Sequence, residues 1–164
     1  MILVDHDPAW PACFARLAAE LARALRPRPV HLEHLGSTAV HGVPARPIID
    51  LGLAVPATDL RGTVERLLAL GYVRRWDVVR PDDTTLFVSP REPCHVVYLC
   101  AAGAPALRAA LAVRDHLRMH PDLAATYGAF KRELAAGSGG DPRRYHAGTA
   151  AFAAAVAARA LAHR

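Results

Sequence analysis

The chain has 164 residues, of which 52% are hydrophobic and 21% charged, and its net charge is +5. This length predicts a single domain over residues 1–164, and the composition excludes a mainly disordered or fibrous chain. The basic residues are 19 arginines and the single Lys131, with no run longer than two. This spread favours diffuse surface charge over a phosphate-facing patch.

Cysteine usage and the first residues predict a cytoplasmic protein with no membrane segment. Cys13, Cys94 and Cys100 are odd in number and form no C-x-x-C pair, so neither a disulfide framework nor a zinc knuckle is expected. The start MILVDHDPAW has two Asp and a Pro where a signal peptide needs an apolar run. Aromatic residues, at 6%, are not interleaved with basic ones, which disfavours nucleic-acid binding.

The spacing of apolar residues distinguishes predicted helices from predicted strands. Helices are expected over 8–25, 58–70 and 105–118, and from Pro121 and Pro142 onward. Strands are expected over 30–35, 48–55, 72–79, 84–89 and 95–100, with one helical turn before Pro44 and a hairpin around Pro81-Asp82-Asp83. A helix, then strands of a mixed sheet, then helices predict an α+β domain.

The most informative segment is the strand that ends in Gly36-Ser37-Thr38, followed by Asp50 on the next strand. Glycine after a strand lets the backbone approach a phosphate, and free amides and hydroxyls at a helix start can hold its oxygens. Asp50 can coordinate a magnesium ion that bridges such a phosphate. An ordinary helix cap, and an Asp50 paired with Arg46 or with a backbone amide, are the structural alternatives.

Several phrases, in order over nearly the whole chain, resemble the GrpB family. They are Asp7-Pro8-Ala9-Trp10-Pro11 with Phe14, Glu33 to Val40, Gly42 to Asp50, Arg114 to Arg118, and Tyr145 with Phe152. The resemblance implies a nucleotidyltransferase-like fold, a mixed β-sheet flanked by helices with a C-terminal helical segment. In that superfamily a Gly-Ser turn binds the triphosphate, and an acid-hydrophobic-acid pair with a third acid on a later strand holds two metal ions.

This sequence matches that pattern only in part. Gly36 and Ser37 match the turn and Asp50 matches the first acid, but Gly52 stands in place of the second acid. Two-metal chemistry needs at least two carboxylates to bridge its cations. The later strand offers His95, which can bind zinc or manganese or act as a general base but is a poor magnesium ligand.

Other polar residues are secondary candidates. Glu33 and His34 point to opposite faces of their strand, so at most one faces a pocket, and His34 is a candidate ligand or phosphate contact. Arg114 and Arg118 share a helix face and can form a fork for an anion, or Asp115 and Arg118, three residues apart, can simply pair. We place Arg114 and Asp115 in the candidate ligand site because the resemblance includes them, and Lys131 on a solvated helix face.

The leading hypothesis is binding of a nucleotide or another phosphorylated small molecule through magnesium or another divalent cation. Asp50 is the metal ligand, Ser37 and Thr38 are the phosphate clamp, and Arg46 or Arg114 stabilises charge. Any catalysis is then phosphoryl or nucleotidyl transfer, with His95 as base or ligand. The alternatives are a non-catalytic ligand sensor or protein-interaction module, and an accessory domain of coenzyme A metabolism, since GrpB-like segments occur fused to dephospho-coenzyme A kinase.

Overall fold

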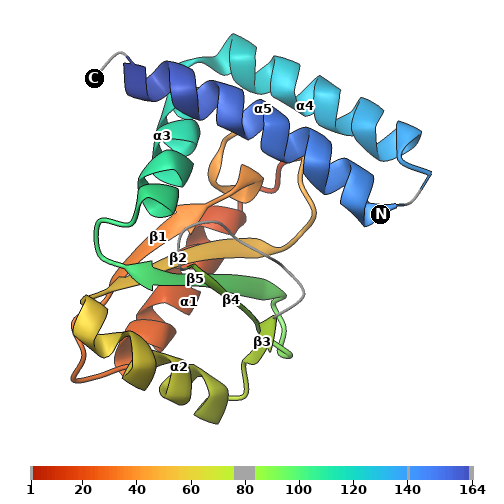
Figure 1. Cartoon of the computed structure of the whole chain (residues 1–164). Helices are drawn as coiled ribbons and strands as arrows, with labels where there is room; N and C mark the ends of the chain where they lie inside the picture. The colour runs from red at the N-terminus through yellow and green to blue at the C-terminus, as the bar shows by residue number, and fades with distance from the viewer. Residues whose placement is uncertain (1, 76–83, 140, 163–164) are drawn as a thin grey trace. The chain divides into compact units, whose positions relative to one another are not determined.

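A computed structural model describes residues 2–75, 84–139 and 141–162 (Figure 1). Within these residues five strands form one mixed sheet in the order β1-β2-β5-β4-β3. The strands are β1 His31–Leu35, β2 Ile49–Val55, β3 Val73–Arg75, β4 Thr85–Val88 and β5 His95–Ala101. The helices are α1 Trp10–Ala24, α2 Leu60–Ala69, α3 Pro105–Met119, α4 Pro121–Gly137 and α5 Pro142–Ala162, with short 3-10 turns η1 Ser37–Ala39 and η2 Ala57–Asp59. The predicted α+β class is confirmed.

The described chain packs into two compact units. Residues 9–35 and the described part of 48–108 form the sheet unit, which holds the five strands with α1 and α2. Residues 2–8, 36–47 and 109–162 form the helical unit, which holds η1, α4 and α5, while α3 begins in one unit and continues in the other. No helix in the described ranges is both long and apolar enough to cross a membrane.

The strand β2 lies inside the sheet, antiparallel to β1 and parallel to β5. Six of its seven residues are buried, as predicted for a strand covered on both faces. Successive side chains point to opposite faces and residues paired across strands point to the same face. One face, the Asp50 face, therefore carries Asp50 and Gly52, and the other, the α1 face, carries Leu51 and Leu53.

The helix α1 covers the second of these faces. Leu17 and Leu21 are buried on its inner side, and the helix contacts β1 and β2. It begins at Trp10, two residues later than predicted, with a proline in its first turn. Phe14 stacks on the ring of His34 with 4.7 Å between ring centroids, which fixes the side of the sheet that α1 occupies.

The predicted hairpin is confirmed where the structure describes it. The strands β3 and β4 pair antiparallel, with Val73 opposite Val88 and Arg75 opposite Leu86. The turn predicted at Pro81-Asp82-Asp83 lies outside the described residues. Pairing of β4 with β5 then places this hairpin at one edge of the sheet.

The helical unit has its own apolar core. Its buried members are Val40, Val43, Leu117, Ala124 and Tyr127. Figure 1 shows α4 and α5 side by side, and the ring of Phe152 stacks on that of Tyr127 at 4.4 Å. Gly148 lets these helices approach closely, because a Cβ atom there would lie 2.6 Å from a methyl group of Leu134. The two predicted helices are thus packed as an antiparallel pair.

Tyr145 makes the stability of this unit fall as the pH rises in the alkaline range. Burial of its hydroxyl, reinforced by Tyr127 and opposed by Arg46, raises the pKa of Tyr145 to about 12 from its ordinary value of 10.0. The neutral form is thus favoured by folding, so its contribution to stability is complete below pH 10 and is lost as the pH rises towards 12. We expect urea midpoints to fall across this window, and to fall less in Tyr145→Phe. Equal losses in both proteins would contradict this assignment.

Candidate functional site

Asp50 is partly buried and has a defined partner within the sheet unit. Tyr98 on β5 donates its hydroxyl to Oδ1 of Asp50 over 3.0 Å. The two residues share a face because Asp50 pairs with Val96 and Gly52 pairs with Tyr98 across the parallel strands. The sequence pattern does not identify Tyr98, since only the strand register tells which residues of β5 share a face with Asp50.

The place of the second acid is filled by apolar side chains. A Cβ atom on Gly52 would lie 2.8 Å from Cδ1 of Leu35 and 3.0 Å from Cδ1 of Leu107. Leu35 comes from β1 and Leu107 from the first turns of α3, and both are buried. The loss of the acid is therefore part of a packed arrangement in which two leucines occupy the space beside Asp50.

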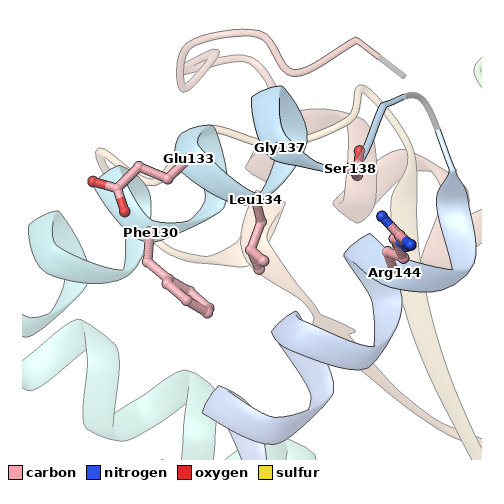
Figure 2. Close-up of a pocket in the computed structure, with 6 residues that line it drawn as sticks. All are labelled: Phe130, Glu133, Leu134, Gly137, Ser138 and Arg144. Carbon is pink, nitrogen blue, oxygen red and sulfur yellow. The ribbon is translucent and has the colours of Figure 1, made fainter.

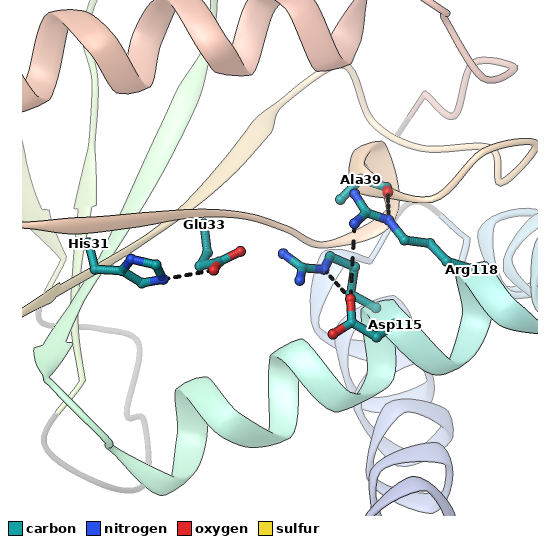
Figure 3. Close-up of polar contacts among 6 residues, drawn as sticks. His31, Glu33, Ala39, Asp115 and Arg118 are labelled. Atoms are coloured by element: carbon teal, nitrogen blue, oxygen red, sulfur yellow. Dashed lines mark hydrogen bonds and ion pairs between the residues drawn. The ribbon is translucent and has the colours of Figure 1, made fainter.

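Glu33 is a second carboxylate on the Asp50 face, where it pairs with Gly52 across β1 and β2. Its Oε1 lies 2.8 Å from Nε2 of His31, as Figure 3 shows, and its side chain is 23% exposed. Glu33 and Asp50 are diagonal neighbours in the register, and Leu35 leans along the other diagonal over Gly52. The two acidic residues are thus neighbours in the register of this face, with Leu35 directly opposite Asp50.

His34 does not lie on the Asp50 face. It pairs with Leu51 on the α1 face, is 5% exposed and stacks on Phe14. The prediction that Glu33 and His34 point to opposite faces is confirmed, but His34 is the one buried under α1. His34 is therefore a core residue. Because side chains alternate along the strand, it cannot share a site with Asp50.

His95 also lies on the α1 face, because its partner across the sheet is Ile49. Its Nδ1 lies 2.7 Å from the carbonyl oxygen of Pro93, and its Nε2 lies 2.8 Å from the hydroxyl of Tyr72. The sheet backbone therefore separates its ring from Asp50. The structure does not bring these two predicted catalytic residues together, although they belong to the same unit.

The turn after β1 belongs to the helical unit. Gly36 has a φ of 69°, a conformation that favours glycine, and η1 follows it directly. Thr38 is 1% exposed, while Ser37 is half-buried and Gly36 exposed. Ser37 and Thr38 stand inside η1 and the capping position is Gly36, so the ordinary side-chain cap considered from the sequence is not formed.

An arginine from α3 holds this turn within the helical unit. Arg118 donates Nε to the carbonyl oxygen of Ala39, the last residue of η1, over 2.8 Å (Figure 3). Asp115 lies 2.8 Å from Nε of Arg114 and 4.0 Å from Nη1 of Arg118. Asp115 therefore pairs with the arginines of this cluster. Arg118 also fixes η1 on α3.

Two basic residues of the helical unit have surroundings that the sequence pattern did not reveal. Arg46 is half-buried and acts electrostatically on Tyr145. Lys131, predicted on a solvated face, is 3% exposed, and its Nζ donates to the carbonyl oxygen of Pro44. That prediction was wrong because loop 36–47 packs over this side of α4, as the close approach of Pro44 to Gly128 shows.

The donors on the Asp50 face limit the metals that fit there. Among the described residues, no three histidine, cysteine or acidic side chains gather as a metal-binding group. Asp50 offers one carboxylate, which suits a magnesium ion that takes its remaining oxygens from phosphate and water. Two ions about 4 Å apart need bridging carboxylates, which the pair Gly52 and Leu35 does not supply.

Two hollows have linings that do not include Asp50 or the turn 36–38. One, of about 320 Å³, is in the helical unit between α4 and α5 (Figure 2), with Phe130 and Leu134 as its apolar wall and Glu133 and Arg144 at its edge. The other, of about 360 Å³, is in the sheet unit and includes His95. His95 is thus the only residue predicted for the site that lines either of these two hollows.

The likeness of the chain to solved structures assigns its mixed sheet and flanking helices to a nucleotidyltransferase-like α+β fold. The Cid1 poly(U) polymerase with magnesium and 3'-dATP bound shares this fold, with a TM-score of 0.51 and 14% identity over 81% of this chain and 45% of that chain. At this identity the likeness concerns the fold alone.

The chain belongs to the GrpB family, whose model, described as GrpB protein, matches residues 1–159. The crystal structure of the conserved protein GrpB from Enterococcus faecalis has a TM-score of 0.85 and 25% identity, over 99% of this chain and 98% of that chain. A UPF0157 protein of Pseudomonas aeruginosa is 37% identical over 169 residues, which are 98% of this chain and 67% of that protein.

A longer relative carries a different name. A dephospho-CoA kinase of Mycolicibacterium paratuberculosis is 33% identical over 170 residues, which are 87% of this chain but 42% of that protein. This chain therefore corresponds to part of that protein, in agreement with the fusion noted for the family.

Proposed function

We propose that this GrpB-family chain binds a nucleotide or another phosphorylated small molecule with one divalent cation, and does so without two-metal nucleotidyl transfer. The observation that carries the proposal is the packing of Leu35 and Leu107 over Gly52, beside the carboxylate of Asp50. This arrangement keeps one acid of the usual pair and fills the space of the other with apolar atoms.

Asp50 is the proposed cation ligand. Its Oδ1 accepts a hydrogen bond from the hydroxyl of Tyr98, which orients this partly buried side chain on the strand β2. Magnesium is commonly held by one or two carboxylates together with substrate phosphates. A single oriented carboxylate is thus enough for a cation that arrives with its phosphorylated ligand, whereas it is too little for a pair of ions.

Within the helical unit, the turn at Gly36 and the basic residues of the Arg114–Arg118 cluster are proposed as anion contacts. Backbone amides at a turn with a left-handed glycine bind phosphate oxygens, and the hydroxyls of Ser37 and Thr38 add donors. Arg118 supports this role by fixing η1, and Arg114 adds positive charge within the same polar cluster. The ligand is expected to carry at least one phosphate.

Isothermal titration calorimetry with magnesium and a panel of ATP, UTP, coenzyme A and dephospho-coenzyme A tests the proposal. We expect at least one of these to bind the wild-type chain only with the metal present. Asp50→Asn is expected to weaken that binding at least tenfold, about 1.4 kcal/mol, because the carboxylate charge is lost while the side chain keeps its size.

Asp122→Asn is the matched control, because Asp122 stands in the first turn of α4 outside the proposed site. It is expected to bind as the wild type does. The absence of binding for the whole panel, or equal affinities for the wild type and Asp50→Asn, would refute the proposal. Metal-dependent release of pyrophosphate by the purified chain would refute the part of the proposal that excludes two-metal nucleotidyl transfer.

A further inference from the structure

The second hollow of about 360 Å³ lies on the α1 face of the sheet unit, across the sheet from Asp50. It is therefore separate from the site proposed above. Its walls come from α1, from the chain after α2, and from the segment between β4 and β5. The lining residues used below are Arg16, Glu20, Tyr72, Arg91, Glu92 and His95.

The inner end of the hollow is a chain of fixed hydrogen bonds. A carbonyl oxygen accepts but cannot donate, so Nδ1 of His95 carries the proton that binds Pro93. The unprotonated Nε2 of neutral His95 then accepts the hydroxyl proton of Tyr72 over 2.8 Å. The Tyr72 oxygen is left as an acceptor for a ligand, and the buried ring of His95 holds it in place.

Apolar side chains form one wall. Leu17, Leu21 and Ala24 follow one another along the inner side of α1, and Leu70 joins them from the end of α2. Small-molecule sites typically combine such a wall with a few polar groups and start at about 300 Å³. The hollow thus suits the apolar body of a small ligand.

Four exposed charges surround this wall, two of each sign. Arg16 and Glu20 stand one helical turn apart on α1, and Arg91 and Glu92 are neighbours before β5. Over the residues that the structure describes, no ion pair within 4.0 Å joins any of these four. Arg91 instead donates to the carbonyl oxygen of Leu70 over 3.3 Å, and Glu92 accepts the amide of Cys94 over 3.0 Å.

Charges of both signs act on the inner end of the hollow. Burial is the main cause that raises the pKa of Tyr72, the positive charge of Arg91 opposes the rise, and the negative charge of Glu20 adds to it. Arg91 and Glu20 are thus both within electrostatic reach of one hydroxyl. A ligand at Tyr72 would meet a positive group from the β5 side and a negative group from α1.

We propose that this hollow binds a small zwitterion with an apolar body, of the chemical class of a free aliphatic or aromatic α-amino acid. A ligand with only a carboxylate would leave Glu20 and Glu92 facing its negative charge, and a ligand with only an amine would leave Arg16 and Arg91 facing its positive charge. A zwitterion pairs with both signs at once and places its side chain on the leucine wall.

The test is saturation-transfer NMR and calorimetry on the full chain with leucine, phenylalanine, phenethylamine and 3-phenylpropionate. The last three share a phenyl ring and differ in carrying both charges, the amine alone or the carboxylate alone. We expect leucine or phenylalanine to bind, and the zwitterion to bind at least tenfold more tightly than its single-charge analogues. No binding of leucine or phenylalanine at about 10 mM, or equal affinities for the three phenyl compounds, would overturn the proposal.

Two charge-removing variants test the position of the site. Glu20→Gln and Arg91→Gln each remove one exposed charge and are each expected to weaken amino-acid binding at least fivefold. Arg61→Gln is the matched control, because Arg61 is an exposed residue of α2 that pairs with Glu65 and does not line the hollow. Asp50→Asn is expected to leave amino-acid binding unchanged, which separates this inference from the proposed function. Equal losses in Arg61→Gln or in Asp50→Asn would overturn the assignment.

Discussion

Gly52→Asp, the substitution that rebuilds the acid-hydrophobic-acid pair, is expected to destabilise the sheet unit by about 3 kcal/mol. A Cβ atom at this position would lie 2.8 Å from Leu35 and 3.0 Å from Leu107, so both leucines must move. The new carboxylate would then lie beside these leucines, on the same face of the sheet as the carboxylates of Glu33 and Asp50. Urea unfolding followed by circular dichroism measures the loss, and an unchanged midpoint would contradict the packing described here.

Two further glycine variants separate the causes of that loss. Gly52→Ala adds the crowding without the charge and is expected to cost about 1 kcal/mol. Gly137→Asp adds the same side chain at an exposed position where a Cβ atom meets nothing within 4 Å, and it is expected to change stability by less than about 1 kcal/mol. Similar losses at positions 52 and 137 would show that aspartate itself, not its surroundings, is responsible.

Removing the side chain of Leu35 is expected to make room for a second carboxylate at position 52. Leu35→Ala alone leaves a cavity and is expected to cost about 3 kcal/mol. Combined with Gly52→Asp it makes room for the carboxylate, so the double variant is expected to lose less stability than the sum of the two single variants. The same double variant should bind manganese more tightly than the wild type, because it then has two carboxylates on one strand. Additive losses with unchanged manganese binding would contradict the idea that Leu35 blocks this position.

The sequence predicts the elements of this fold well and the sides of its sheet poorly. Helix α1 and strand β2 follow from local periodicity and end within two residues of their expected bounds. Whether a residue of β5 lies on the same face as Asp50 depends on the register between β2 and β5, which are more than 40 residues apart in the chain. In this register Ile49 pairs with His95. A one-residue difference in this register moves a side chain to the other face, so the sequence pattern places His95 with Asp50 and does not identify Tyr98.

Sequence periodicity does not predict the burial of Lys131 either. The residues around it on α4 show a mixed pattern, and a lysine at such a place is usually solvated. Its burial arises from loop 36–47, which brings the carbonyl oxygen of Pro44 onto the helix from almost 90 positions earlier. Local patterns therefore identify the candidate residues, whereas long-range packing decides their partners.

Lys131→Met is expected to destabilise the helical unit by about 2 kcal/mol, although it keeps the length and the apolar stem of the side chain. It removes the donor to the buried carbonyl oxygen of Pro44, and an unsatisfied buried acceptor costs about 1–3 kcal/mol. It also removes a cation 5.4 Å from the centroid of the Tyr127 ring, worth about 0.5–1 kcal/mol. Urea unfolding measures the total.

The neighbouring Arg132→Met is the matched control. Arg132 pairs with Asp5 at the surface, and exposed ion pairs contribute about 0–1 kcal/mol. Because Lys131 is the single lysine of the chain, its modification by an amine-reactive reagent, followed by peptide mapping, reports how often this contact opens. The side chain is expected to be protected under native conditions and to react at denaturing urea. Rapid native labelling, or equal stability losses in the two variants, would place Lys131 in solvent and remove the contact that joins loop 36–47 to α4.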